Sequence, residues 1–317
     1  MHTRVLTPFT AGDGENLALY HWQAELSSKP PEDLGVPSRG VVLIVHGLGE
    51  HAGRYDFVAN SLCHWGFKVC AYDHRGHGES TGLPGVLPTL TALLDDLTEV
   101  LDDTRQQHPT LPLILLGHSL GGLVTSRFVA LDMRPVDALV LSSPAFDAGL
   151  GKFQKLLLKV LPGIAPNLCV NNGLNANFLS RDPQVVKAYL SDRLVHNKIS
   201  PRLGQFIATA GPATIAAAAN WRTPTLLMYA GADKLVNPEG SRNFATAAAQ
   251  SSTVKPGMVI AKCFDGYYHE LFNEPEPAPV FELLKTWLDA RFYALNWPEA
   301  YLMRVLTAIK FIVFIKP

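Results

Sequence analysis

Short runs of consecutive apolar residues recur along the chain, and each run ends at a glycine, histidine, serine or aspartate. The runs cover residues 41–45, 68–72, 113–116, 138–141 and 225–229. Continuous rather than alternating hydrophobicity is typical of strands that are buried on both faces, as in a parallel sheet. Helix-compatible stretches lie at residues 54–64, 90–107 and 120–131. This alternation predicts an α/β fold with a mostly parallel, doubly wound sheet.

Residues 146–221 interrupt the alternation. This segment has helical patches at 152–160, 184–190 and 203–219, joined by turns rich in proline and asparagine such as 162–163 and 171–173. Because no apolar run followed by glycine appears there, we interpret the segment as a mostly helical insertion between two strands of the sheet. The chain then divides into an α/β core at residues 1–145 and 222–291, the insertion at 146–221, and an apolar C-terminal tail at 292–317.

The composition is apolar and poor in charge. Of the 317 residues, 47% are hydrophobic and 17% are charged, against roughly 25% charged residues in an average soluble protein. A formal net charge of −1 gives no long-range attraction to polyanions, so we expect no nucleic-acid partner. The N-terminal residues lack the pattern of a signal peptide, and no run approaches the roughly 18 apolar residues of a spanning helix. We therefore expect a cytoplasmic protein that carries an apolar surface.

Residues 117–121 read Gly-His-Ser-Leu-Gly and match the pattern G-x-S-x-G directly after an apolar run and before a helix. In this context the serine sits on a strained turn, where flanking glycines relieve crowding and the start of the helix favours developing negative charge. A glycine-rich turn with an incidental serine is the alternative, and the strand–turn–helix context argues against it. We predict that Ser119 is a nucleophile.

A serine hydroxyl needs a base to accept its proton, and folds with this turn order their catalytic groups as serine, acid, histidine. His269 follows the last predicted strand, and no other histidine comes after His196, so we predict that His269 is the base. Asp233 ends the apolar run at 225–229 and is the predicted orienting acid. Asp265 is the rival, although four residues of separation in a loop make its geometry toward His269 awkward.

Acyl transfer also needs hydrogen-bond donors for an oxyanion. One is the backbone N–H after the nucleophile, at Leu120, and the other comes from the loop after the first long strand, where Leu48 is the natural donor. Five histidines lie between His46 and His77, but their spacing matches no zinc pattern, and the four cysteines form no C-x-x-C pair. We expect neither a metal nor a cofactor.

The chain resembles the α/β-hydrolase superfamily and, within it, the monoacylglycerol lipase and lysophospholipase group. The resemblance rests on blocks at residues 46–55, 73–80, 117–122, 231–236 and 268–274, which follow the family's order. It implies that Ser119, Asp233 and His269 form a triad and that Leu48 and Leu120 form the oxyanion hole. The serine in G-x-S-x-G excludes the relatives that use an aspartate nucleophile, namely epoxide hydrolases and haloalkane dehalogenases.

The same resemblance implies that the insertion at 146–221 is a cap whose helices line a hydrophobic acyl tunnel. Phe153, Leu157 and Leu161 are the candidate substrate-binding residues there, although periodic leucines are also typical of an ordinary core. We expect a serine esterase or lipase acting on fatty-acyl esters, either monoacylglycerols or lysophospholipids. A thioesterase, an acyltransferase or a carbon–carbon hydrolase with the same triad, and a catalytically silent lipid-binding protein, are the alternatives.

The tail at residues 292–317 departs from the family pattern. On a helix its few polar residues fall within one arc, and Arg304 and Lys310 interrupt the apolar remainder, which argues against a membrane span. An amphipathic helix lying on a membrane would suit a lipid esterase, whereas docking on the protein's own body or on a second subunit is the equal alternative. The pattern leaves the oligomeric state open.

Overall fold

A computed structural model describes residues 2–24, 38–149 and 151–292. Its main sheet contains β1 (His2–Thr10), β2 (Asn16–Ala24), β3 (Val41–Val45), β4 (Lys68–Tyr72), β5 (Leu113–His118), β6 (Ala138–Ser142), β9 (Thr225–Ala230) and β10 (Val259–Phe264). The helices of the core are α1 (Asp56–His64), α2 (Ala92–Gln107), α3 (Leu120–Ala130), α7 (Pro238–Gln250) and α8 (Ala278–Asp289). Short 3-10 turns η2 (Ala52–Tyr55) and η5 (Leu271–Asn273) lie in the core loops.

The eight-stranded sheet has the order β1-β2-β4-β3-β5-β6-β9-β10. The strands from β4 to β10 run parallel, and β2 joins them antiparallel to β4. This confirms the predicted α/β fold with a mostly parallel sheet. The antiparallel hairpin of β1 and β2 was not predicted, because β1 is largely exposed and carries no continuous apolar run.

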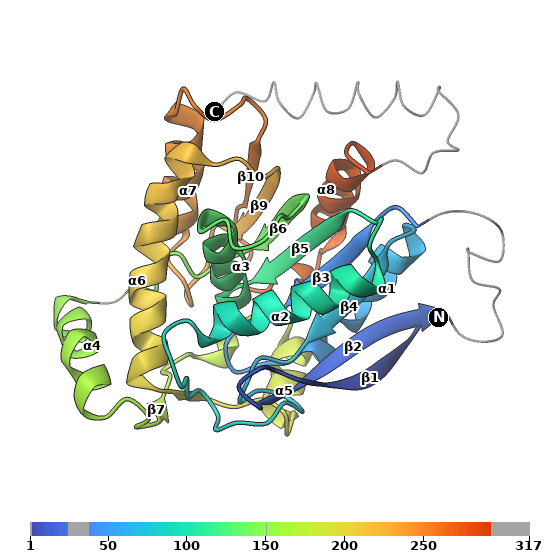
Figure 1. The fold of residues 1–317 in the computed structure, drawn as a ribbon. Helices are drawn as coiled ribbons and strands as arrows, with labels where there is room; N and C mark the ends of the chain where they lie inside the picture. The colour runs from blue at the N-terminus through green and yellow to red at the C-terminus, as the bar shows by residue number, and fades with distance from the viewer. Residues whose placement is uncertain (1, 25–37, 150, 293–317) are drawn as a thin grey trace, which may run out of the picture.

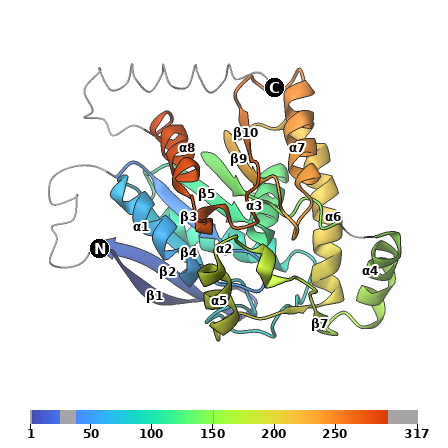
Figure 2. The ribbon, with the colours of Figure 1, turned by 180° about the vertical axis from the view of Figure 1, so that it is seen from behind.

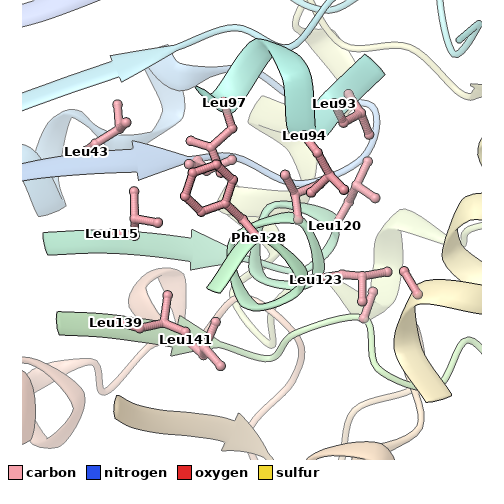
Figure 3. Close-up of a cluster of buried hydrophobic side chains, with 14 of the residues drawn as sticks. Leu43, Leu93, Leu94, Leu97, Leu115, Leu120, Leu123, Phe128, Leu139 and Leu141 are labelled. Atoms are coloured by element: carbon pink, nitrogen blue, oxygen red, sulfur yellow. The ribbon is translucent and has the colours of Figure 1, made fainter. Parts of the chain in front are cut away.

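Two helical layers bury both faces of this sheet (Figures 1 and 2). In the central strands, alternate residues belong to two different clusters: in β3, Leu43 packs with α2 and α3, whereas Ile44 packs with α1 and α8. Figure 3 shows the first cluster, in which leucines of β3, β5 and β6 face Phe128 of α3 and Leu97 of α2. Burial on both faces explains why the strand sequences are continuously apolar.

The segment between β6 and β9 forms the inserted part, which we call the cap. It contains α4 (Lys152–Ile164), η3 (Ala176–Phe178), α5 (Pro183–Ser191), α6 (Pro201–Ala217) and η4 (Ala218–Asn220), with a small sheet of β7 (Val170–Asn171) and β8 (Lys198–Ile199). The sequence predicted no strand in this segment, since two-residue strands carry no detectable pattern. It also predicted a turn at residues 162–163, but α4 continues through Pro162 to Ile164. Pro162 has no N–H to donate to the Leu158 carbonyl, so the last turn of α4 lacks that hydrogen bond.

The carboxyl ends of β3 and β5 lie side by side, with Val45 paired to Gly117. The chain leaves β3 toward β4 on one side and reaches β5 on the other, so this is the point where the strand order reverses. Ligands of open α/β sheets bind at such a point. Among the helices of the described residues, none combines the length and apolar character that crossing a membrane requires. Apart from Phe292, the predicted tail lies outside the described residues.

Candidate active site

Ser119 occupies the sharp turn between β5 and α3. Its backbone has φ 52° and ψ −118°, a left-handed conformation that non-glycine residues rarely adopt. Three backbone hydrogen bonds hold the turn: Ser119 donates to the Ser142 carbonyl at 3.0 Å, and its own carbonyl accepts from Leu123 and Ala145, each at 3.0 Å. Strain held in place by surrounding structure marks a functional site, and here it places the serine at the start of α3.

The two glycines of the motif are required by close packing. A Cβ at Gly117 would meet the Gly121 carbonyl oxygen at 2.6 Å, and a Cβ at Gly121 would collide with the Val45 carbonyl oxygen. The first turn of α3 therefore packs directly against the end of β3. The sequence pattern gave the same reason for these glycines, and the geometry now supplies the atoms that require them.

His269 lies in the loop after β10 and is almost fully buried. Its Nδ1 is 2.7 Å from Asp233 Oδ2, and Asp233 Oδ1 accepts from the backbone N–H groups of Leu235 at 2.8 Å and Val236 at 3.1 Å. The structure thus brings together the predicted base and the predicted acid. The rival, Asp265, is exposed and accepts a hydrogen bond from the Cys263 thiol.

The electrostatics of this pair favour an ionised acid and a basic imidazole. Burial alone would raise the pKa of Asp233, but the charge and hydrogen bond of His269 and the two backbone donors outweigh it, so the pKa is lowered. Burial alone would lower the pKa of His269, but Asp233, with help from Glu270 and Glu50, raises it above the ordinary 6.5. His269 is therefore a stronger base than a free histidine.

The predicted oxyanion donors flank the nucleophile. Leu120 is the first residue of α3, so its N–H has no partner within the helix, while its side chain is buried in the core (Figure 3). Leu48 follows Gly47 in the loop after β3, and a Cβ at Gly47 would lie 3.1 Å from Ser119 Cβ. The loop that carries Leu48 therefore lies against the nucleophile. His46 shapes this loop: its Nε2 accepts from the His74 N–H at 2.9 Å.

Two cavities meet at Leu48, Ser119 and His269. The first, which we call the apolar cavity, has a volume of about 330 Å³ and extends under α4 and α6 of the cap, where Leu157, Leu161 and Ile207 line it. Two of the three predicted cap residues, Leu157 and Leu161, thus line it. The side chain of the third, Phe153, lies outside the described residues.

The second, which we call the polar cavity, has a volume of about 750 Å³. Five asparagines of the cap line it: Asn171, Asn172, Asn175, Asn177 and Asn197. It also contains the carboxylates of Glu50, Asp192 and Glu270 and the guanidinium of Arg54. No role was predicted for these residues: Glu50, Arg54 and Glu270 lie within the family-like blocks, whereas the asparagines and Asp192 carried no signal in the sequence. In the described part of the chain, no group of histidine, cysteine, aspartate or glutamate side chains is arranged to hold a metal ion.

The chain is similar to a known protein family and to several lipases. A family model described as serine aminopeptidase, S33, matches residues 36–276. Monoacylglycerol lipase of Mycolicibacterium smegmatis is 37% identical over 79% of this chain and 88% of that protein. Phospholipase YtpA of Bacillus subtilis is 31% identical over 78% of this chain and 95% of that protein. The crystal structure of Paleococcus ferrophilus monoacylglycerol lipase has a TM-score of 0.72 and 31% identity, covering 90% of this chain and 98% of that one.

Proposed function

Because the chain belongs to the serine aminopeptidase S33 family of α/β-hydrolases, within the monoacylglycerol lipase group, we propose that it hydrolyses monoacylglycerols through an acyl-enzyme intermediate. The observation that carries the proposal is local. A strained serine at the start of a helix shares its cavities with a buried histidine that is hydrogen-bonded to an ionised aspartate. This is the combination of nucleophile, base and orienting acid that acyl transfer needs.

The reaction runs in two steps. Ser119 Oγ attacks the ester carbonyl while His269 accepts its proton, and the oxyanion receives the N–H groups of Leu48 and Leu120. His269 then protonates the departing alcohol, leaving the acyl group on Ser119. A water molecule, deprotonated by His269, cleaves this acyl-enzyme and releases the fatty acid. Asp233 holds the Nδ1–H of the imidazole and stabilises its charged form throughout. No cofactor takes part in this mechanism.

The apolar cavity supports a fatty-acyl substrate. Leucine, isoleucine, valine and alanine side chains make up most of its lining, the described part of the lining contains no carboxylate, lysine or arginine, and the cavity begins at Ser119. An acyl chain placed there gains free energy in proportion to the apolar area that leaves water. The leaving alcohol then occupies the polar cavity on the other side of the nucleophile.

The charges of the polar cavity favour an uncharged alcohol. The described lining residues include three carboxylates and one guanidinium, and the nitrogens of Arg54 already bind Glu50 and Glu270. Burial lowers the pKa of His118 to about 4, so this neighbour is neutral at pH 7. A phosphate-bearing head group would enter a negative field, whereas glycerol hydroxyls can donate to carboxylates and accept from asparagine amides. Monoacylglycerols are therefore favoured over lysophospholipids.

The outer face of α4 supports contact with a lipid surface. Leu156, Val160 and Ile164, spaced four residues apart on one face of α4, expose 57%, 50% and 75% of their area, and a contiguous exposed apolar patch is typical of an interaction site. Figures 1 and 2 show α4 at the edge of the molecule, away from the sheet. Because Leu157 on the same helix lines the apolar cavity, this surface is continuous with the acyl site. We include peripheral membrane contact through α4 in the proposal.

Two assays test the proposal. Wild-type protein should hydrolyse a monoacylglycerol with a kcat/KM about tenfold or more above that for the lysophosphatidic acid with the same acyl chain. Ser119→Ala should lower the turnover about 10⁴-fold or more. Near-native activity of Ser119→Ala would overturn the mechanism; preference for the phosphorylated substrate would overturn the substrate. In liposome flotation, the double variant Leu156→Ser/Ile164→Ser should bind liposomes less than the control variant Leu83→Ser does. Leu83 is an exposed leucine outside the cap.

A further inference from the structure

A guanidinium lies between two buried carboxylates beside the candidate active site. Arg54 Nη1 is 2.6 Å from Glu50 Oε2 and 2.7 Å from Glu270 Oε1, and Arg54 Nη2 is 2.7 Å from Glu270 Oε2. The three side chains expose only 12%, 5% and 5% of their area. Glu270 lies 216 residues from Arg54 along the chain, so the contact joins two distant loops. We call these three residues the carboxylate–guanidinium bridge.

The Glu50 end of the bridge holds the loop of the oxyanion donor. Glu50 Oε1 accepts from the Gly47 N–H at 2.6 Å and from the Tyr55 hydroxyl at 2.8 Å. Gly47 immediately precedes Leu48 and lies against Ser119. A shift of the Glu50 carboxylate would therefore move the Leu48 N–H relative to the nucleophile.

The Glu270 end holds the loop of the base. Glu270 directly follows His269, and its Oε2 accepts from Asn273 Nδ2 at 2.8 Å in addition to Arg54. Its backbone N–H donates to the Leu179 carbonyl of the cap at 2.8 Å. The residue after the base is therefore fixed by its side chain from one side and by its backbone from the other.

We propose that Glu50, Arg54 and Glu270 are positioning residues that fix the oxyanion loop and the base loop at one separation across Ser119. This inference rests on the function proposed above. A buried ion pair is weak evidence for stability, because desolvation offsets its attraction. Bidentate geometry between a guanidinium and carboxylates does give directional precision. The ring of Tyr189 from α5 lies over Arg54, with 4.9 Å from the guanidinium carbon to the ring centre, so a cap residue also packs against the bridge.

The bridge also sets the charge around the base. The titratable groups that face His269 are Asp233, Glu50, Glu270 and His118. Burial alone would raise the pKa of Glu50, but the charge of Arg54, the neighbouring imidazoles and the Tyr55 hydrogen bond together outweigh it, and the pKa is lowered, so Glu50 is ionised at neutral pH. Both bridge carboxylates add to the rise in the pKa of His269 that Asp233 causes. Neutralising one of them should lower the pKa of the base.

The test uses four bridge variants of the full chain and p-nitrophenyl butyrate. Glu50→Ala should lower kcat about 10- to 100-fold with little change in KM, because the oxyanion donor acts in the transition state. Glu50→Gln should lose much less kcat than Glu50→Ala does, since the amide oxygen can still accept from the Gly47 N–H. Arg54→Lys should lower kcat because it loses the bidentate contact. Glu270→Gln should move the acidic limb of the kcat/KM profile to lower pH.

The matched control is Arg39→Lys. Arg39 Nη2 binds Asp289 Oδ1 at 2.7 Å, both side chains are buried, and the pair involves no residue of the two cavities. This variant should lower the melting temperature on the scale of Arg54→Lys but leave kcat and the pH profile unchanged. A merely structural bridge would lower melting temperatures without moving the acidic limb in Glu270→Gln.

The outcomes separate the inference from the proposed function. If Ser119→Ala abolishes turnover while Glu50→Ala keeps its kcat and Glu270→Gln keeps its acidic limb, the bridge has no positioning role and the inference fails alone. If Glu50→Ala is unfolded by circular dichroism, the kcat of Arg54→Lys and the acidic limb of Glu270→Gln decide the question in the same way. If Ser119→Ala retains turnover, the proposed function itself fails.

Discussion

The apolar and polar cavities share Leu48, Ser119 and His269, together with Leu235 and the cap residues Asn171, Asn172 and Leu174, and they differ in the rest of their lining. Outside the shared residues, mostly apolar side chains line the first cavity, whereas three further asparagines and three carboxylates line the second. The shared catalytic candidates, Ser119 and His269, and the oxyanion-loop residue Leu48 come from the core, on the loops after β3, β5 and β10, whereas the cap supplies most of what distinguishes the two cavities. The difference teaches that chemistry and specificity reside on different parts of the chain. Changes at Ser119, Asp233 and His269 should affect every substrate equally, and cap changes should affect substrates selectively.

The largest effect is expected from Asp233, the acid that orients the shared base His269. Asp233→Asn preserves the shape of the side chain but favours the wrong imidazole tautomer, and we expect kcat to fall about 10⁴-fold. The loss should be equal for short and long esters and for glycerol and methyl esters. Steady-state kinetics with the four substrates measure this loss of kcat. A loss confined to one substrate class would contradict the assignment of the chemistry to the core and of the specificity to the cap.

A smaller and selective effect is expected from filling the apolar cavity. Leu161→Trp should lower kcat/KM for a 16-carbon monoacylglycerol about 10- to 100-fold and leave a 4-carbon ester unchanged, because only the long chain reaches α4. Leu83→Trp is the control, since Leu83 is 68% exposed and lines neither cavity. Equal losses for both chain lengths would place the acyl chain elsewhere.

The pH dependence should be the same for all substrates. The neutral imidazole of His269 accepts the proton, and its pKa is raised above 6.5 by Asp233. Activity is therefore full above this pKa and falls about tenfold per pH unit as pH drops below it. The kcat/KM profiles of a short ester and a long monoacylglycerol should share one acidic limb that lies above pH 6.5. Separate limbs for the two substrates would mean that the base is not common to both.

The smallest effect is expected in the polar cavity. Asn197→Leu removes one amide from its lining, and we expect KM for a monoacylglycerol to rise about three- to tenfold while KM for the methyl ester of the same acid stays unchanged. Asn243→Leu, at an exposed position on α7, is the control. A change in KM for the methyl ester would show that Asn197 acts on the acyl chain instead.

The sequence predicted the parts of the molecule whose signal is local. The apolar runs located β3 to β6 and β9 because burial on both faces requires continuous hydrophobicity, and the G-x-S-x-G turn located a strained serine because glycines must flank it. The pairing of Glu50, Arg54 and Glu270 could not be predicted. It depends on how two loops separated by 216 residues meet, and a charged residue in a loop usually faces solvent.

The cap was also predicted less completely, because the position of its helices over the core depends on tertiary packing and not on local sequence. Its helices carry an apolar period that the sequence displays, but a periodic leucine is equally typical of a core and of a cavity wall. Only the arrangement of α4 and α6 over Ser119 distinguishes the two cases for Leu157 and Leu161. Some asparagines of the polar cavity also stabilise a turn, which by itself explains their presence in the sequence: Asn171 Oδ1, for example, accepts from the Gly173 N–H at 2.8 Å.

Labelling with alkyl fluorophosphonates tests most directly the claim that one nucleophile serves two cavities. Peptide mass spectrometry of the wild-type protein should place the adduct on Ser119, and the modification should not form in Ser119→Ala. Leu161→Trp should slow labelling by a long-alkyl probe while leaving a short-alkyl probe unaffected, because only the long probe enters the apolar cavity. An adduct on another residue, or equal slowing of both probes, would contradict the account.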